Sequence, residues 1–398
     1  MPADRVERLA ELIVRVGANV QPGQVVSVDC EPGREEAARA IATAAYRHGA
    51  RFVDVDHFDP WLKRIRIEHA AAETLDWVPP WYGDRALQLG ETRAAVIALN
   101  GTVAPTLYDD LDPALVARDR LPSLKEYAKL VNARTVNWCV APCPTPAWAE
   151  LAYPELEPAE ALEALWQAVE HVCRLDEDDP AAAWAERLSQ LGDATAKLNA
   201  RRFDALHFEG PGTDLTVGLL PSSRWESGTT ETVDGIVHLA NLPTEETYTA
   251  PDPERVDGVV RASMPFFAAD VVVRGLELRF EGGRVTELHA ETGAEALRGE
   301  LATDDGACRL GEVALVDGAG RVGSLGTVFY ETLLDENAAS HLAFGNAYEE
   351  SVAPEELPRL NTSDIHRDFM IGSDEVAVTG LTAAGERVPV LRRGDWQL

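Results

Sequence analysis

The stretch that decides the fold of the first half runs from residue 25 to residue 57 and reads VVSVDCEPGREEAARAIATAAYRHGARFVDVDH. It opens on a short β-branched run, Val25 to Val28, which favours a strand. The alanine-rich segment Glu35 to His48 favours a helix, and Gly49 is suited to end it. A second strand, Phe52 to Val55, follows. This order predicts a βαβ unit with parallel strands.

The same alternation extends through the first half, where Ala94 to Leu99 and Thr135 to Val140 favour further strands. Strands separated by helices predict a mainly parallel sheet covered on both faces. After residue 200 the pattern changes to short strands with tight turns, as in Leu276 to Phe280 and Val285 to His289 around Glu-Gly-Gly. We therefore expect an α/β N-terminal domain over 1–200 and an α+β C-terminal domain with a mainly antiparallel sheet over 201–398.

Composition narrows the class of protein. The chain has 398 residues, 36 Lys and Arg against 67 Asp and Glu, and a formal net charge of -31. Such a surface repels nucleic acid and anionic membranes, so we expect neither as a partner. Five scattered cysteines, and an N-terminal stretch with charges among its apolar residues, favour reduced thiols and a cytoplasmic protein without a signal peptide or membrane span.

Two histidine motifs stand out in the second half. His366 and Asp368 lie two residues apart in SDIHRDFMIGS, so an extended strand would present both on one face as a platform for a divalent metal. His341 and Tyr348 lie seven residues apart, and a helix would place them on one face. A phenol at such a place can donate a hydrogen bond to a substrate, although Tyr348 is equally consistent with an ordinary half-buried aromatic.

Acidic residues supply further candidate ligands. Glu312 interrupts the apolar, strand-like run LGEVALVD, where a buried carboxylate is costly unless it is paired or bound to a metal. The alternative is an outward-facing residue of an edge strand. Glu245 and Glu246 follow a proline in NLPTEE, and adjacent acids in a loop are usually solvated, but a stiff loop also suits a metal ligand.

Taken together, these residues form the ligand inventory of a carboxylate-rich, two-metal hydrolase. Two divalent ions about 3.5–4 Å apart activate a water and polarise a carbonyl, and a nearby free carboxylate can carry the proton. The sequence contains no GxSxG, HExxH, GxxxxGK[ST] or GxGxxG motif, so serine hydrolases, zincins and nucleotide-binding proteins lack support.

Several segments resemble the aminopeptidase T and aminopeptidase S group of thermophilic metallopeptidases. The resemblance covers nearly the whole chain and is most specific after residue 205. The segments that carry it are GANVQPGQVVSV (17–28), GPGTDLTVGL (210–219), NLPTEE (241–246), LGEVALVD (310–317), FYETLLDENAASHLAFGNAY (329–348) and SDIHRDFMIGS (363–373).

The resemblance implies a metal-dependent aminopeptidase that releases N-terminal amino acids from short peptides. It implies a homodimer with a catalytic C-terminal domain and two divalent ions per chain, zinc, cobalt or manganese. The implied bridging carboxylate is Glu312 or Asp368, and Tyr348 would stabilise the oxyanion. Apart from the resemblance, we expect Glu245, as the best nearby candidate, to act as general base or to pair with the substrate's ammonium group. The implied metal ligands are Glu246, Glu312, His341, His366 and Asp368.

Some positions depart from the family pattern. Thr247 and Tyr248 stand where an apolar pair is usual, WESG (225–228) replaces a more glycine-rich turn, and Asp395 replaces an expected amide. None of these changes removes a proposed ligand, so they bear on substrate preference.

Two other functions use the same residues. His341, His366 and Asp368 alone match the two-histidine, one-carboxylate set of non-haem iron oxygenases, and ring-cleaving dioxygenases occur among relatives of this fold. Those enzymes need one metal, so the presence of Glu246 and Glu312 argues against them. The third hypothesis is a non-catalytic, acidic dimer in which the metals are structural.

Overall fold

The structure, a computed structural model, describes residues 3–122, 124–269 and 271–398. It contains two compact units. The first comprises residues up to Arg187 together with Gly228–Thr244, and the second comprises Leu188–Ser227 and Glu245–Leu398. The expected boundary at residue 200 lies within helix α9 (Pro180–Arg201). Segment 228–244 belongs to the first unit because its main chain bonds there: Leu239 donates to Gly17 O at 2.8 Å, and Val140 donates to Ala240 O at 2.8 Å.

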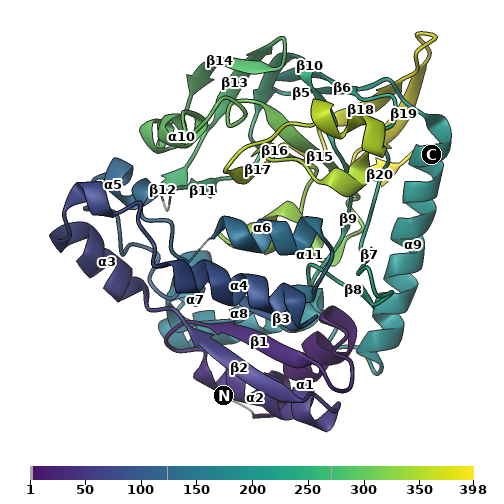
Figure 1. Ribbon diagram of the computed structural model, residues 1–398. Helices are drawn as coiled ribbons and strands as arrows, with labels where there is room; N and C mark the ends of the chain where they lie inside the picture. The colour runs from purple at the N-terminus through teal and green to yellow at the C-terminus, as the bar shows by residue number, and fades with distance from the viewer. Residues whose placement is uncertain (1–2, 123, 270) are drawn as a thin grey trace. The chain divides into compact units, whose positions relative to one another are not determined.

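The first unit is built on a parallel sheet, in agreement with the sequence prediction. Within the described residues its strand order is β2-β1-β3-β4, and β1, β2 and β3 are labelled in Figure 1. The consecutive residues Val26, Ser27 and Val28 are all buried, so both faces of β1 are covered. The four strands are β1 (Val25–Cys30), β2 (Phe52–His57), β3 (Ala95–Asn100) and β4 (Asn137–Pro142).

Helices on this sheet begin and end where the local chemistry favours it. Asp59 accepts a hydrogen bond from Trp61 N at 2.9 Å and caps α3, and Gly49 has a left-handed φ of 88° just after α2. The helices and small strands of this unit are α1 (Ala3–Leu12), η1 (Ile13–Gly17), α2 (Glu35–Arg47), α3 (Pro60–His69), η2 (Ala72–Thr74), α4 (Pro80–Glu91), α5 (Pro113–Arg118), α6 (Lys125–Asn132), α7 (Pro146–Ala152), α8 (Pro158–Val172), β7 (Thr230–Glu231) and β8 (Val237–His238).

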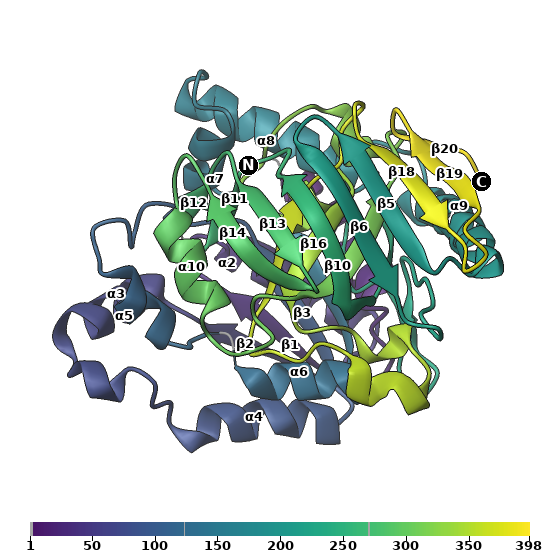
Figure 2. The same cartoon turned by 90° about the horizontal axis from the view of Figure 1, so that it is seen from above.

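The second unit contains a large antiparallel sheet. Figure 2 looks onto it, with the strand order β14-β13-β10-β6-β5-β18-β19-β20 among the described residues. The expected hairpin turn at 281–283 joins β13 to β14, and both of its glycines have positive φ. The strands are β5 (Ala205–Gly210), β6 (Thr213–Leu219), β10 (Pro251–Arg261), β13 (Glu277–Glu281), β14 (Arg284–His289), β18 (Ala377–Leu381), β19 (Arg387–Arg392) and β20 (Asp395–Trp396).

A smaller antiparallel sheet of the same unit has the order β17-β16-β15-β9. Its strands are β9 (Glu246–Thr249), β15 (Leu310–Val316), β16 (His341–Gly345) and β17 (His366–Met370). The remaining elements are β11 (Phe266–Ala268), β12 (Val271–Val273), α10 (Ala294–Leu301), α11 (Arg321–Ser324), α12 (Thr332–Glu336), η3 (Glu349–Ser351) and η4 (Pro354–Arg359).

The core of the second unit lies between its two sheets. Phe344 and Phe369 of the smaller sheet stack with ring centroids 4.7 Å apart, and Phe280 of the larger sheet lies 6.3 Å from Phe344. These rings belong to one buried cluster with Val313 and Leu342. Because strand side chains alternate, this packing leaves the opposite face of the smaller sheet for other side chains.

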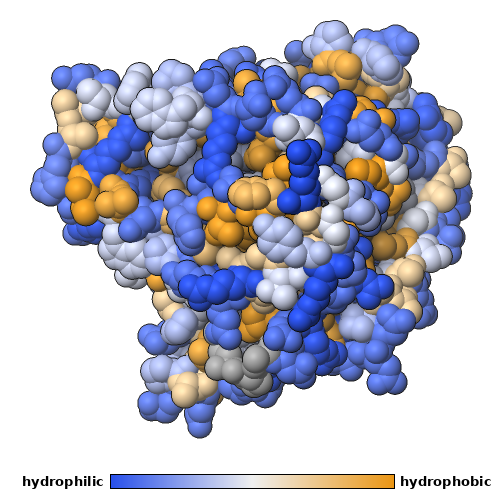
Figure 3. Space-filling model, turned by 60° about the horizontal axis from the view of Figure 1, so that its bottom comes forward, coloured by the Kyte–Doolittle hydropathy of each residue, from blue (hydrophilic) through white to orange (hydrophobic). Residues whose placement is uncertain are grey.

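One face of the molecule illustrates how its side chains are distributed. Hydrophilic side chains predominate on the face drawn in Figure 3, with hydrophobic ones scattered between them. Among the described residues, no helix has both the length and the apolar character needed to cross a bilayer.

Candidate metal centre

The candidate site lies on the face of the smaller sheet that turns away from the aromatic core (strands labelled in Figure 1). Residues directly opposite each other in an antiparallel pair share a face. Glu312, Ala343 and Asp368 form one such row across β15, β16 and β17. Ala314 opposite His341, and Gly345 opposite His366, form the neighbouring pairs. Small residues therefore lie in the middle of the face, with charged side chains around them.

The side chains of this face converge. His341 Nε2 lies 3.1 Å from Glu246 Oε2 and 4.0 Å from Glu312 Oε1. His366 Nε2 lies 3.1 Å from Glu312 Oε2 and 3.5 Å from Asp368 Oδ1. All five predicted ligand residues are thus brought together from four strands.

The donor atoms fall into two groups, each with its atoms within 4.8 Å of one another. One group is Glu246, Glu312 and His341; the other is Glu312, His366 and Asp368. Glu312 belongs to both, offering Oε1 to one histidine and Oε2 to the other. Of the two carboxylates that the sequence left open as a bridge, only Glu312 has this shared position among the described residues.

Main-chain carbonyls orient both histidines. His341 Nδ1 lies 3.2 Å from Ala339 O, and His366 Nδ1 lies 2.8 Å from Asn346 O. A carbonyl only accepts hydrogen bonds, so each Nδ1 carries the hydrogen. The Nε2 atoms, which face the carboxylates, are therefore the atoms available to a metal.

The pKa shifts of the site residues indicate that added positive charge would stabilise the cluster. Burial alone lowers the pKa of His341, but Glu246, Asp368 and Glu312 raise it to about 10. Burial raises the pKa of Glu312, and the hydrogen bond from His366 only partly opposes this. Without a cation, protons on the histidines compensate for buried carboxylates. Divalent ions would replace those protons, so the donor set fits a metal centre.

Two tyrosines border the cluster. The ring of Tyr348 lies 5.1 Å from that of His366, and the ring of Tyr248 lies 5.5 Å from that of Tyr348. Burial, followed by the charges of Glu312 and Asp368, raises the pKa of Tyr348 well above its ordinary value. The phenol therefore keeps its proton and can donate a hydrogen bond.

The predicted helix that would carry His341 and Tyr348 is wrong. His341 lies on β16, and the strand ends at Gly345, whose φ of 90° suits glycine and turns the chain. Tyr348 follows this turn and still reaches the site through His366. The sequence HLAFGNAY contains an apolar alternation of period two that fits a strand, and this is the signal that indicates β16.

Glu245 has a different environment from Glu246. It is buried, its backbone N–H donates to Asn337 Oδ1 at 2.6 Å, and its side chain lies beside Gly320. Among the described residues it belongs to neither donor group.

Glu336 is a site residue that the sequence analysis missed. It ends helix α12, is 9% exposed, and its pKa is raised well above the ordinary value, first by burial and then by Asp368 and Glu246. Its neighbour Asn337 also holds the backbone of Glu245, so α12 supports two sides of the site. The signal for Glu336 in the sequence is the same as for Glu312, because acidic residues stand among apolar ones in LLDENAA.

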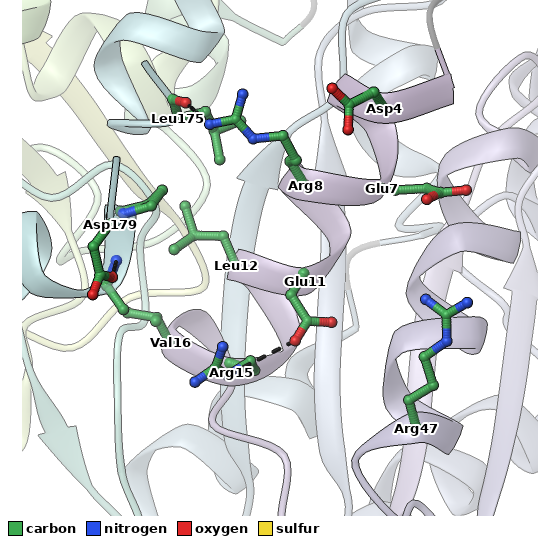
Figure 4. A pocket seen from close by; sticks show the side chains of 12 residues that line it. Asp4, Glu7, Arg8, Glu11, Leu12, Arg15, Val16, Arg47, Leu175 and Asp179 are labelled. Atoms are coloured by element: carbon green, nitrogen blue, oxygen red, sulfur yellow. Dashed lines mark hydrogen bonds and ion pairs between the residues drawn. The ribbon is translucent and has the colours of Figure 1, made fainter. Parts of the chain in front are cut away.

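A separate pocket in the first unit has a different character. Its volume is about 360 Å³, and Figure 4 shows charged side chains of α1 and η1 on its wall, including the Arg15–Glu11 ion pair at 3.8 Å. Arg8 donates to the carbonyl of Leu175 at its edge. No histidine or cysteine lines it among the described residues, so the pocket does not resemble the metal-type cluster of the second unit.

Comparison with known proteins agrees with the donor set. The family model described as thermophilic metalloprotease (M29) matches residues 3–396. The chain belongs to this family. The resemblance expected from the sequence is therefore confirmed.

Curated relatives of this M29 chain match it from end to end. Aminopeptidase T of Thermus thermophilus is 42% identical over 400 residues, covering 98% of each chain. Aminopeptidase 2 of Geobacillus stearothermophilus is 37% identical, covering 98% of this chain and 97% of its own. Aminopeptidase AmpS of Bacillus subtilis is 34% identical, covering 99% of this chain and 98% of its own.

A solved structure confirms the fold. Wild-type AmpT from Thermus thermophilus matches with a TM-score of 0.91 and 41% identity, covering 99% of both chains. The M29 chain therefore has the expected architecture, with a mainly parallel sheet in the N-terminal part and antiparallel sheets in the later part.

Proposed function

We propose that this M29 chain releases N-terminal amino acids from short peptides by means of two divalent metal ions, zinc, cobalt or manganese. The underlying enzyme class, a metallo-aminopeptidase, follows from the family and from relatives named aminopeptidase. The observation that carries the two-metal proposal is the pair of donor groups that share Glu312.

Each ion would have its own ligands. Glu246 and His341 would hold one ion, His366 and Asp368 the other, and Glu312 would bridge them with its two oxygens. Mixed nitrogen and oxygen ligands suit zinc, cobalt and manganese. When bound, such a pair supplies Lewis acidity and a water of lowered pKa.

The chain's own groups would guide the peptide. Tyr348 keeps its phenol proton beside His366 and would donate a hydrogen bond to the scissile carbonyl oxygen as negative charge develops on it. His341 and Glu312 are almost fully buried, and the lower polarity around them strengthens this interaction.

A carboxylate must accept the proton of the attacking water. Glu245, predicted for this role or for pairing with the substrate's ammonium group, remains one candidate. Glu336 is the second, because it ends α12, which packs near β17, and because burial, followed by the charges of Asp368 and Glu246, raises its pKa well above the ordinary value.

The proposed enzyme has an expected compartment, oligomeric state and set of partners. We propose a cytoplasmic homodimer that acts on short peptides and has no nucleic-acid or membrane partner. The net charge of -31 supports the exclusion of nucleic acid. The five free cysteines, four of them buried, are consistent with a reducing compartment.

Metal removal and restoration test the function. The purified protein is stripped with a chelator and assayed on leucine p-nitroanilide with and without added zinc, cobalt or manganese, while bound metal is counted by mass spectrometry. We expect hydrolysis only after metal addition and two ions per chain. One iron per chain without hydrolysis would contradict the proposal and favour an oxygenase.

A further inference from the structure

Tyr248 occupies the same sheet face as the candidate ligands. It pairs with Ala314, which pairs in turn with His341, so these three residues form one row across β9, β15 and β16. Its main chain is fixed by two hydrogen bonds of 2.9 Å, one in each direction, with Glu226. The methyl side chain of Ala314 leaves room for the large ring next to it.

Tyr248 also makes two contacts with the segment that carries Tyr348. Its ring packs on Tyr348 at 5.5 Å with a 59° tilt, and its hydroxyl donates to Glu350 Oε1 at 3.4 Å. Glu350 lies two residues beyond Tyr348 on η3. The packing contact and the hydrogen bond thus hold the same turn from two sides.

Arg224 also holds this turn through hydrogen bonds. Arg224 donates from its backbone to Ser351 O at 2.8 Å and from Nη2 to Glu350 O at 2.6 Å. Thr249, the residue after Tyr248, donates to Arg224 O at 2.7 Å. Segment 348–351 is therefore linked to β9 through Arg224, by backbone and side-chain hydrogen bonds, and Tyr248 adds the contact to the aromatic side chain itself.

Tyr348 needs such a partner because it lies in a connection and not on a strand. Strand and helix neighbours restrict side chains on regular elements, whereas a side chain in a turn depends on what packs against it. On one side Tyr348 meets His366, and on the other it meets Tyr248.

We propose that Tyr248 is a positioning residue whose ring holds the phenol of Tyr348 at the metal centre. The proposal rests on the function of Tyr348 proposed above. In this proposal the ring of Tyr248 sets the orientation of Tyr348. The hydrogen bond between the Tyr248 hydroxyl and Glu350 has a smaller, supporting effect.

A double-mutant cycle separates positioning from general destabilisation. Y248A, Y248F, Y348F and the double variant Y248A/Y348F are compared in kcat, KM, bound metal and melting temperature. We expect Y248A to lower kcat about tenfold with KM changed less than about twofold and two ions still bound. Y248F retains the ring and should lose only about threefold.

The decisive comparison is the double variant. If Tyr248 acts through Tyr348, Y248A/Y348F should have a kcat within about twofold of Y348F alone. Additive losses, or wild-type kcat in Y248A, would overturn the proposal. Y46A, which removes a half-exposed tyrosine of the first unit, is the control for loss of a tyrosine.

A structural readout keeps the test independent of peptide hydrolysis. In the crystal structure of metal-loaded Y248A, or of Y248L if Y248A does not fold, Tyr348 should leave its 5.1 Å contact with His366. An unchanged Tyr348 would contradict the proposal. Failure of the wild-type enzyme to hydrolyse any peptide would instead count against the proposed function and leave this readout intact.

Discussion

Glu312 on β15 and Asp368 on β17 lie in one register row, on opposite sides of Ala343. Only the methyl group of Ala343 separates the two carboxylates on this face of the sheet. The row explains how two strands that do not pair with each other can contribute to one site, because the strand between them carries a small side chain.

Enlarging Ala343 should empty the site without unfolding the chain. In A343V, the branched side chain suits a strand but extends into the space between Glu312 and Asp368. We expect loss of most bound metal and activity, with a melting temperature close to that of the metal-free wild type. L342V changes the opposite, core-facing side at a cost of about 1 kcal/mol and should keep both ions. Full metal content in A343V would contradict the position assigned to the ions.

Removal of the shared carboxylate should affect both ions. E312Q is expected to lower activity at least about 100-fold, since even the outer partners of metal ligands matter by 10–100-fold. Its metal content should approach zero, whereas D368N should retain one ion, both measured by mass spectrometry. E287Q changes an exposed residue with 74% of its side chain accessible and serves as the control. Equal metal contents in E312Q and D368N would show that Glu312 is not the bridge.

Two matched amide variants, E336Q and E245Q, identify which carboxylate accepts the proton. If Glu336 accepts the proton, E336Q should lower kcat by about 100-fold or more while E245Q changes kcat less and KM more. The reverse result would support Glu245. Normal kcat in both variants would show that neither carboxylate takes the proton. Circular dichroism and metal content of each variant provide the controls.

Metal affinity should increase with pH. His341 has a pKa of about 10 without metal, against 6.5 ordinarily, and a metal at Nε2 must displace that proton. The apparent affinity should therefore rise by up to about tenfold per pH unit for each proton released, as measured by calorimetry in buffers of different ionisation enthalpy. Affinity that is independent of pH between 6 and 9 would contradict His341 as a ligand.

The same shift gives the metal-free protein a pH-dependent stability. A histidine whose pKa is raised by folding stabilises the protein fully below about 6.5, and this contribution is lost as the pH rises toward about 10. The raised pKa of Glu312 and that of Glu336 act in the same direction. The free energy of unfolding of the chelated protein should thus fall with rising pH, and bound metal should restore it.

Much of the fold could be predicted because its signals are local. The period-two spacing of His366 and Asp368 and the apolar run around Glu312 both correspond to strands in the structure. The βαβ pattern of residues 25–57 likewise gave parallel strands. Each of these elements is short and has one consistent periodicity.

What could not be predicted depends on contacts between distant residues. His341 was expected on a helix, but its pairing with Ala314 and Met370 makes it a strand residue. Glu336 comes to the site only because α12 packs near β17. Nothing in the local sequence separates Glu245 from Glu246; pairing of Glu246 with Val316 sets the face on which its side chain lies.

The Nδ1 atoms of both candidate histidine ligands contact peptide carbonyls, of Ala339 and Asn346, and not side chains. The side chains at those two positions can change without altering the tautomer, because every amino acid brings the same carbonyl. The path of the backbone therefore sets which ring nitrogen of His341 and of His366 carries the hydrogen.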